Sequence, residues 1–179
     1  MTHLMNTYNR LPVAFTRGKG ARLYDEQGNE YLDALAGIAV NGLGHAHPRL
    51  TAALTDQVSC LIHTSNVYRV REQEMLADRI CALSGMQEVF FANSGAEANE
   101  AALKLVRMFG HKRGEPEAQT LVMERAWHGR TLATLAATGS EKARKGFEPF
   151  PTGFISVPYN DIDAVKRTAE ADRRVLAAC

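Results

Sequence analysis

The sequence predicts an α/β protein with a mostly parallel sheet, preceded by an N-terminal segment that contains a hairpin. In the second half of the chain, short apolar runs of strand type alternate with longer stretches of helical period. This alternation is typical of parallel strands joined by crossover helices. The 179 residues are 45% hydrophobic and 23% charged, which is typical of a globular protein with one sizeable core.

The N-terminal segment is expected to cover residues 1–65. The chain alternates from Ala21, breaks at residues 27–29 and resumes up to Asp33, which predicts a hairpin. A glycine-punctuated apolar loop should follow at residues 37–44. Pro48 stands near the start of a predicted helix that runs to about His63, because proline is favoured in the first helical turn.

Residues 66–179 are expected to form the first half of a larger α/β domain. A helix is predicted over residues 72–83, ended by Ser84 and Gly85. The apolar run Glu88–Ala92 predicts a buried strand that leads directly into a second helix. The apolar face of that helix is expected to comprise Ala98, Ala101, Ala102, Leu105 and Phe109.

Further strands are predicted at residues 120–123 and 154–157. A short helical segment should lie between them and end at Gly139, and the charged residues 140–146 should be solvated. The run Asn160–Asp163 has the composition of a helix start. The last residues, up to Cys179, are expected inside or just after a crossover helix, with no returning strand.

Composition argues against several classes of partner. The net charge of +1 provides no field for a nucleic-acid backbone or an anionic membrane surface, so a small molecule is the expected partner. The N-terminus has no signal-peptide pattern and no stretch is of membrane-span length, so cytoplasmic location is expected. The chain has three cysteines, Cys60, Cys81 and Cys179. They form no CxxC or Cys/His ligand pattern, so neither a disulfide framework nor a metal site is predicted.

The paired histidines His45 and His47 are the nearest approach to a metal-binding pattern. No third ligand follows at a recognisable spacing. We therefore expect these side chains to orient a tight turn through hydrogen bonds.

Ser94, Gly95 and Ala96 stand where the predicted strand turns into a helix. Backbone N–H groups at a helix N-terminus attract anions, and small side chains let a phosphate approach them closely. The alternative is an ordinary capping box between Ser94 and Glu97, with no ligand.

A second candidate element, WHGRT at residues 127–131, follows the next predicted strand and should lie at the same sheet edge. Trp127 can stack on a heteroaromatic ring, and Arg130 can bind a carboxylate with two hydrogen bonds. Taken singly, a tryptophan is more often a core residue and a loop arginine more often a solvated one.

Three motifs together resemble a known family. They are GIAVNGLGHAHP at residues 37–48, FANSGAEANEAALK at 91–104 and WHGRT at 127–131. In this order they are similar to the successive signatures of the class III pyridoxal-phosphate aminotransferases, and most of all to the acetylornithine aminotransferases. The resemblance covers essentially the whole chain and implies a fold type I transferase with an incomplete large domain.

The resemblance also implies residue roles. Pyridoxal 5'-phosphate would be the cofactor, with its phosphate on Ser94, Gly95 and Ala96 and its ring stacked on Trp127, where the family usually has phenylalanine. Arg130 would bind the α-carboxylate of the substrate. The family's acidic partner of the pyridinium nitrogen and its Schiff-base lysine lie later than Cys179, so no catalytic residue is assigned within the chain, which is expected to be a fragment.

The activity that the resemblance implies is transfer of the terminal amino group of N-acetylornithine to 2-oxoglutarate in arginine biosynthesis, by a homodimer. Succinylornithine, ornithine or 4-aminobutyrate as amino donor is the alternative within the class. A non-catalytic truncated remnant is the alternative outside it. A nucleotide-binding domain is disfavoured because no GxGxxG or P-loop motif follows a strand.

Overall fold

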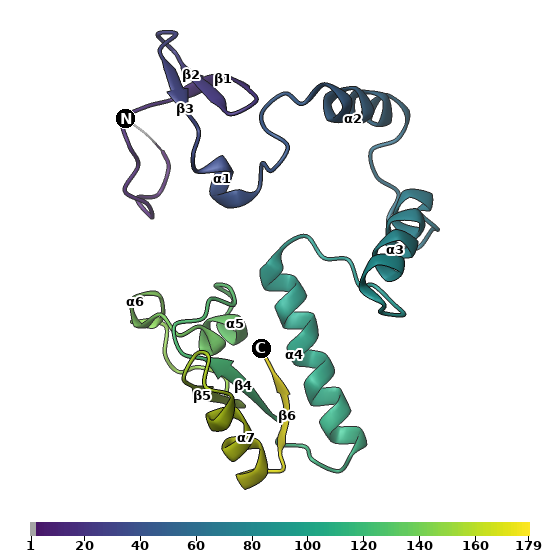
Figure 1. Ribbon diagram of the computed structural model, residues 1–179, viewed down its shortest axis with the longest axis vertical. Coiled ribbons are helices and arrows are strands. Elements are labelled where there is room, and N and C mark those ends of the chain that lie inside the picture. The colour runs from purple at the N-terminus through teal and green to yellow at the C-terminus, as the bar shows by residue number, and fades with distance from the viewer. Residues whose placement is uncertain (1–2) are drawn as a thin grey trace. The chain divides into compact units, whose positions relative to one another are not determined.

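The computed structural model describes residues 3–179 and consists of two compact units, one ending at Glu74 and one running from Met75 to Cys179 (Figure 1). The boundary falls inside helix α3 (Arg71–Ser84), which confirms the helix predicted for residues 72–83. No helix in the described part of the chain is both long and apolar enough to cross a bilayer.

The first unit contains an antiparallel sheet in the order β1-β2-β3. The predicted hairpin is confirmed as β2 (Arg22–Asp25) and β3 (Glu30–Leu32), while β1 (Phe15–Lys19) is an additional strand that pairs with β2. The buried carboxylate of Asp25 stabilises the turn by accepting the Asn29 N–H at 2.8 Å and the Tyr31 hydroxyl at 2.9 Å. The pKa of Asp25 is lowered most by the hydrogen bond from the Asn29 side-chain amide, at 2.9 Å, and further by these two bonds.

The glycine-punctuated segment forms a short turn of helix, α1 (Ala36–Ala39), and the next helix is α2 (Pro48–Cys60). His45 anchors the chain between them. Its Nε2 lies 2.7 Å from Asp33 Oδ2 and its Nδ1 lies 2.9 Å from Asn41 Nδ2. The prediction that this histidine orients a turn is therefore confirmed, and the contact lowers the pKa of Asp33.

The second unit continues from α3 with helices and strands in alternation. In chain order these are α4 (Gly95–Lys112), β4 (Gln119–Met123), α5 (Leu132–Ala137), α6 (Glu141–Arg144), β5 (Phe154–Val157), α7 (Ile162–Ala171) and β6 (Val175–Ala178). The strands form one parallel sheet in the order β5-β4-β6. The predicted parallel α/β fold is confirmed.

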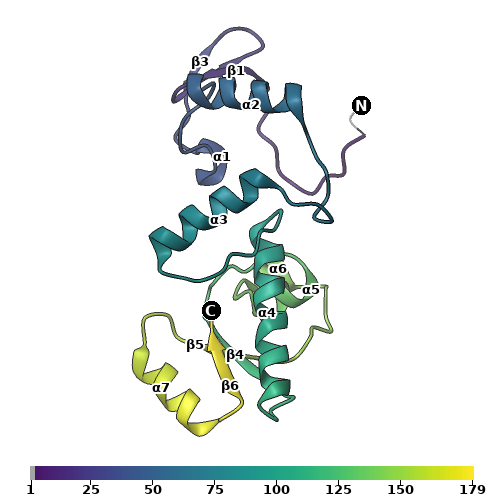
Figure 2. The same cartoon turned by 90° about the vertical axis from the view of Figure 1, so that its right-hand side faces the viewer.

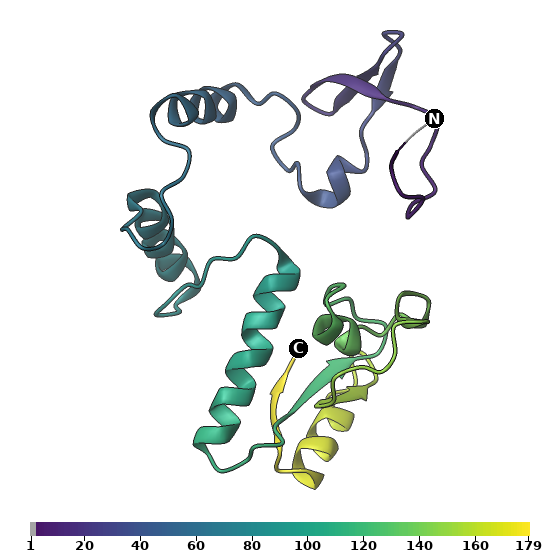
Figure 3. The ribbon, with the colours of Figure 1, turned by 180° about the vertical axis from the view of Figure 1, so that it is seen from behind.

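Helices α4 and α7 lie on opposite faces of this sheet (Figure 2). On the α7 face, Leu121 and Val157 pack against Ala164 in the buried core. On the other face, α4 runs alongside β4 and β6 (Figure 3). The alternation of side chains along β4 therefore supplies both layers.

The strand predicted at Glu88–Ala92 is wrong. This segment has no hydrogen-bonded neighbour among residues 3–179, and the side chain of Phe90 is 73% exposed. A strand needs a partner along its edge, and the sheet does not reach this segment.

The prediction that no strand returns after the last helix is also wrong, because β6 pairs in parallel with β4. The run Val-Leu-Ala-Ala contains good helix formers and has no clear alternation, so its period did not reveal a strand.

The predicted apolar face of α4 is wrong in orientation, although its helical period is right. Leu105 and Phe109 are about half exposed. The face turned to the rest of the unit is the neighbouring one and comprises Ala96, Asn99, Leu103, Val106 and Gly110, with Ala102 of the predicted face at its margin. Gly110 allows this packing, since a Cβ there would lie 2.7 Å from that of Ala118.

Candidate functional site

Helix α4 begins with a side-chain cap. Ser94 has extended backbone angles, φ −154° and ψ 160°, and its Oγ accepts the Glu97 N–H at 3.2 Å. Glu97 Oε2 accepts the N–H of Asn93 at 2.6 Å, one residue earlier than in a regular capping box. The capping interpretation of Ser94 is thus confirmed in part, and its hydroxyl proton stays available to a ligand.

The cap leaves the start of the helix open to an anion. The first N–H groups of a helix have no acceptor within it, and here Ser94 takes those of Glu97 and Ala98. The N–H groups of Gly95 and Ala96 thus point out of the helix end. A Cβ at Gly95 would meet no atom within 4 Å, so the approach to these amides is unobstructed.

The second candidate element begins with a tight turn after β4. Arg125 has φ +63°, which is uncommon for a residue with a side chain, and Gly139 donates its N–H to Ala126 O at 2.8 Å. The turn leaves the side chains of Trp127 and Arg130 exposed. The Arg130 guanidinium carbon lies 5.3 Å from the centre of the Trp127 ring, within cation–π range.

His128, between them, is buried. Its backbone N–H donates to Thr138 Oγ1 at 3.1 Å, and its Nδ1 lies 3.5 Å from Cys179 Sγ. Its Nε2 is buried with no hydrogen-bond partner in the described part of the chain. Burial lowers the pKa of His128, so the imidazole is neutral at physiological pH.

The structure brings the two elements into contact. Gly129, with φ +136°, packs so closely that a Cβ there would lie 2.8 Å from the Ala96 Cβ and 2.6 Å from Thr134 Oγ1. Asn99 Nδ2 donates to His128 O at 2.8 Å. All the site residues predicted from the sequence therefore belong to two adjoining segments, the first turn of α4 and the loop at residues 127–131.

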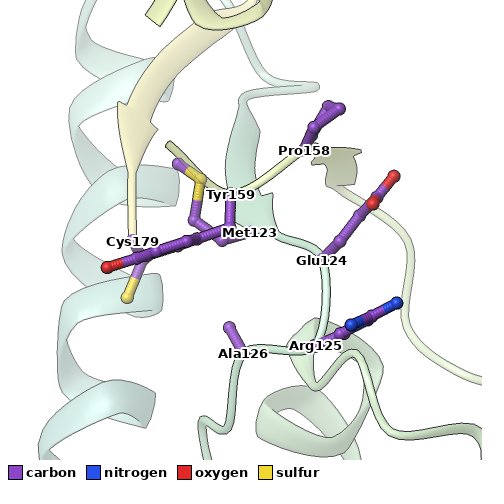
Figure 4. Close-up of a pocket in the computed structure, with 7 residues that line it drawn as sticks. All are labelled: Met123, Glu124, Arg125, Ala126, Pro158, Tyr159 and Cys179. Carbon is purple, nitrogen blue, oxygen red and sulfur yellow. The ribbon is translucent and has the colours of Figure 1, made fainter. Parts of the chain in front are cut away.

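A hollow of about 550 Å³ lies at the carboxyl ends of the parallel strands, next to this loop (Figure 4). Its walls come from the residues that end or follow β4, β5 and β6: Met123, Glu124, Arg125, Ala126, Pro158, Tyr159 and Cys179. In Figure 4 the side chains of Glu124 and Arg125 point to the same side, away from Cys179. Ligands of α/β sheets characteristically bind outside this edge.

Sequence reasoning missed several residues of this region. Glu124 and Tyr159 could have been found, because each comes just after a predicted strand. Asn99 carried a weaker signal, a poor helix former inside a helix three residues after Ala96. Thr138 carried none, because its role depends on the fold of the loop.

The family model described as aminotransferase class-III matches residues 4–178. The chain is 59% identical over 177 residues to an acetylornithine aminotransferase of Nitrosomonas europaea, covering 99% of this chain and 45% of that protein. It is 49% identical over 173 residues to the acetylornithine aminotransferase of Aquifex aeolicus, covering 96% and 46%. The chain therefore spans a little under half the length of these relatives.

Solved structures of transaminases also match the chain. The ornithine aminotransferase of Toxoplasma gondii matches with a TM-score of 0.92 at 31% identity, over 98% of this chain and 42% of that one. An omega-transaminase from Thermomicrobium roseum matches with a TM-score of 0.88 at 26% identity, over 99% and 46%.

Proposed function

The chain belongs to the class III aminotransferases, and we propose that the complete protein uses pyridoxal 5'-phosphate to transfer the terminal amino group of N-acetylornithine to 2-oxoglutarate in arginine biosynthesis. The observation that supports this most is the contact of Gly129 with Ala96. It joins an open helix N-terminus to a loop with an aromatic ring and a guanidinium. These are the group types that a phosphorylated heteroaromatic cofactor and a carboxylate substrate require.

The residues present fit the cofactor. The N–H groups of Gly95 and Ala96 and the hydroxyl of Ser94 would hold its phosphate. The exposed indole of Trp127 would stack on its ring. When bound, the cofactor supplies an electron sink for chemistry at the carbon that bears the amino group, while the protein positions the reactants. The Toxoplasma gondii structure carries pyridoxal phosphate at partial occupancy in its active site.

Arg130 is the proposed carboxylate-binding residue. Its guanidinium lies against Trp127, so the ring and the cation belong to one surface. A planar guanidinium can bind a carboxylate with two parallel hydrogen bonds. The Trp127–Arg130 contact would restrict the arginine before the substrate arrives and lower the entropic cost of binding.

Ornithine is the second candidate amino donor, favoured by the structural match to an ornithine aminotransferase. The relatives at 49–59% identity are named for acetylornithine, and for that reason we put acetylornithine first. We further propose that the complete protein is a cytoplasmic homodimer, which size-exclusion chromatography with light scattering and cell fractionation would test.

The cofactor assignment is tested with Gly95→Val. The fold has open space for the new side chain, so a loss of pyridoxal phosphate binding would come from the blocked amides. We expect affinity to fall about tenfold or more. Gly42→Val is the matched control, because a Cβ there also meets nothing within 4 Å. Equal affinity in both variants would refute the phosphate site.

The substrate assignment is tested on the protein at its full natural length. Initial rates with 2-oxoglutarate would be compared for N-acetylornithine, succinylornithine, ornithine and 4-aminobutyrate. We expect the highest kcat/KM for N-acetylornithine. A higher value for another donor would replace acetylornithine in the proposal, and no turnover with any of them would refute it.

A further inference from the structure

We propose that Asn99 is a positioning residue that locks the Trp127–Arg130 loop to the first turns of α4, so that the phosphate-binding turn and the ring platform act as one unit. This inference rests on the proposed function. Asn99 itself touches neither proposed ligand group and would act through the backbone of His128.

Asn99 lies one turn into helix α4. It follows Ala96 by three residues, which places both on the same face of α4. Ala96 is in the proposed phosphate cradle, and its Cβ adjoins Gly129. The face that contains the end of the cradle is therefore the face that meets the loop.

The side chain of Asn99 donates a hydrogen bond to the loop. Asn99 Nδ2 lies 2.8 Å from the carbonyl oxygen of His128, a residue that is 29 positions away in sequence and directly follows Trp127. A carbonyl oxygen only accepts, so the amide must present its NH₂ group to it. An aspartate or a leucine of similar size could not make this contact.

The other backbone polar group of His128 is held by Thr138. The His128 N–H donates to Thr138 Oγ1 at 3.1 Å, and Thr138 is almost fully buried. The Thr138 hydroxyl in turn donates to Thr134 O at 2.9 Å in α5. Both backbone polar groups of His128 are thus occupied, one by Thr138 at the end of α5 and one by Asn99 in α4. Asn99 ties the part of the loop next to Trp127 to α4, while Glu100 accepts a hydrogen bond from the Thr131 hydroxyl at the other end of the loop.

The hydrogen bond of Asn99 should matter for a ligand that is anchored at both ends. Inorganic phosphate needs only the helix turn, whereas pyridoxal phosphate needs the turn and the indole at a fixed separation. Two rigidly connected subsites act at a high effective concentration, and that advantage is lost when their connection loosens. Asn99 should therefore affect the binding of pyridoxal phosphate and leave that of phosphate alone.

The experiment uses Asn99→Leu in the full chain, with inorganic phosphate and pyridoxal phosphate titrated separately. Trp127 is the only tryptophan among these 179 residues, so in the 179-residue chain its fluorescence reports directly on the ring platform. We expect pyridoxal phosphate to bind about tenfold more weakly, with less quenching of Trp127 and unchanged phosphate affinity. Asn99→Gln, which retains an amide donor, should recover part of the loss.

Arg107→Ala is the matched control. Arg107 Nη2 also ties α4 to a loop carbonyl, Thr152 O at 3.1 Å, but at the other end of the helix. This variant should leave both affinities unchanged. Equal loss of phosphate and pyridoxal phosphate in Asn99→Leu, or no loss of either, would overturn the positioning role.

A ligand-free measurement separates this inference from the proposed function. The fluorescence anisotropy of Trp127 should fall in Asn99→Leu and stay unchanged in Arg107→Ala, because only the first removes a hydrogen bond next to Trp127. Unchanged anisotropy in Asn99→Leu would overturn the inference whatever the protein binds. If the wild-type protein binds no pyridoxal phosphate at its full natural length while the anisotropy still falls in Asn99→Leu, the cofactor is refuted and the tether is established.

Discussion

The guanidinium carbon of Arg130 lies 5.3 Å from the centre of the Trp127 ring, although one was predicted from the sequence as a substrate ligand and the other as a cofactor platform. The two proposed functions therefore share one exposed surface. The contribution of each side chain can nevertheless be measured separately, by donor kinetics for Arg130 and by cofactor binding for Trp127.

Arg130→Ala should raise the KM for the amino donor about ten- to a hundredfold in the complete protein, with little change in cofactor affinity. A charge-assisted contact of this kind contributes about 1.5–3 kcal/mol. Steady-state kinetics with varied donor would measure it. Arg113→Ala is the control, because Arg113 also stacks on an aromatic ring, that of Phe109 at 5.4 Å, far along α4 from the site. A donor KM unchanged by Arg130→Ala would remove this residue from the substrate site.

Trp127→Ala should weaken pyridoxal phosphate binding roughly fivefold, since stacking contributes about 1 kcal/mol beyond burial. It should also shift the absorption band of the bound cofactor. Trp127→Phe keeps a ring in place and should be nearly neutral. If alanine and phenylalanine behave alike in a spectroscopic titration, the ring of Trp127 does not contact the cofactor.

Gly129→Ala should destabilise the second unit and also weaken the site. A Cβ there meets Ala96 and Thr134, and φ +136° is unfavourable for any side chain. Gly146→Ala is the control for backbone strain alone, because Gly146 has φ +89° but open space around it. Strain of this kind costs about 1–2 kcal/mol, so Gly129→Ala should lower the Tm clearly further than Gly146→Ala. Similar Tm values would show that the neighbours of Gly129 can move enough to accommodate a methyl group.

His128 should make stability depend on pH. Its folded-state pKa is lowered by burial from the ordinary value of 6.5, so the unfolded chain takes up a proton that the folded chain resists. Its contribution to stability is complete above about pH 6.5 and is lost as the pH falls from there through the folded-state pKa. Tm measured from pH 8 to pH 5 should fall less steeply in His128→Gln than in wild type. His111→Gln, an exposed histidine on α4, should retain the wild-type slope, and a wild-type slope in both variants would contradict the prediction.

No lysine of this chain should form a stoichiometric adduct with pyridoxal phosphate. A lysine that forms a Schiff base readily at neutral pH needs a desolvated pocket or a neighbouring cation, and an exposed side chain does not lie in a desolvated pocket. Every lysine in residues 3–179 is exposed: Lys19, Lys104, Lys112, Lys142, Lys145 and Lys166. Borohydride reduction followed by peptide mapping should find scattered, partial labelling. Complete labelling of a single lysine would contradict this.

Local chemistry made much of the fold predictable. The strand at residues 154–157, the helix start after Asn160 and the hairpin before Asp33 depend on alternation, capping and turn residues that lie within a few positions of one another. Asp161, for example, caps α7 by accepting the Ala164 N–H at 2.8 Å. The same locality explains why the turn at Ser94 and its small neighbours could be proposed as an anion site from the sequence.

Tertiary structure decided what local chemistry left open. Helical period alone does not say which face of α4 is buried, and the sheet selected Asn99 and Val106 over Leu105. An apolar run also needs a neighbouring strand to form a strand itself. Residues Val175–Ala178 pair with β4, whereas Glu88–Ala92 has no strand partner in the described part of the chain.

By itself, the sequence determined the family, the alternation of helices and strands, and the identity of the candidate site residues, because each depends on motifs a few residues long. Only the tertiary structure decided that Ala96 meets Gly129 and that Asn99 reaches the carbonyl of His128. These contacts join segments about 30 residues apart through the packing of α4 and α5 around the loop. Packing of this kind is set by the summed shape of many side chains, which no local pattern encodes.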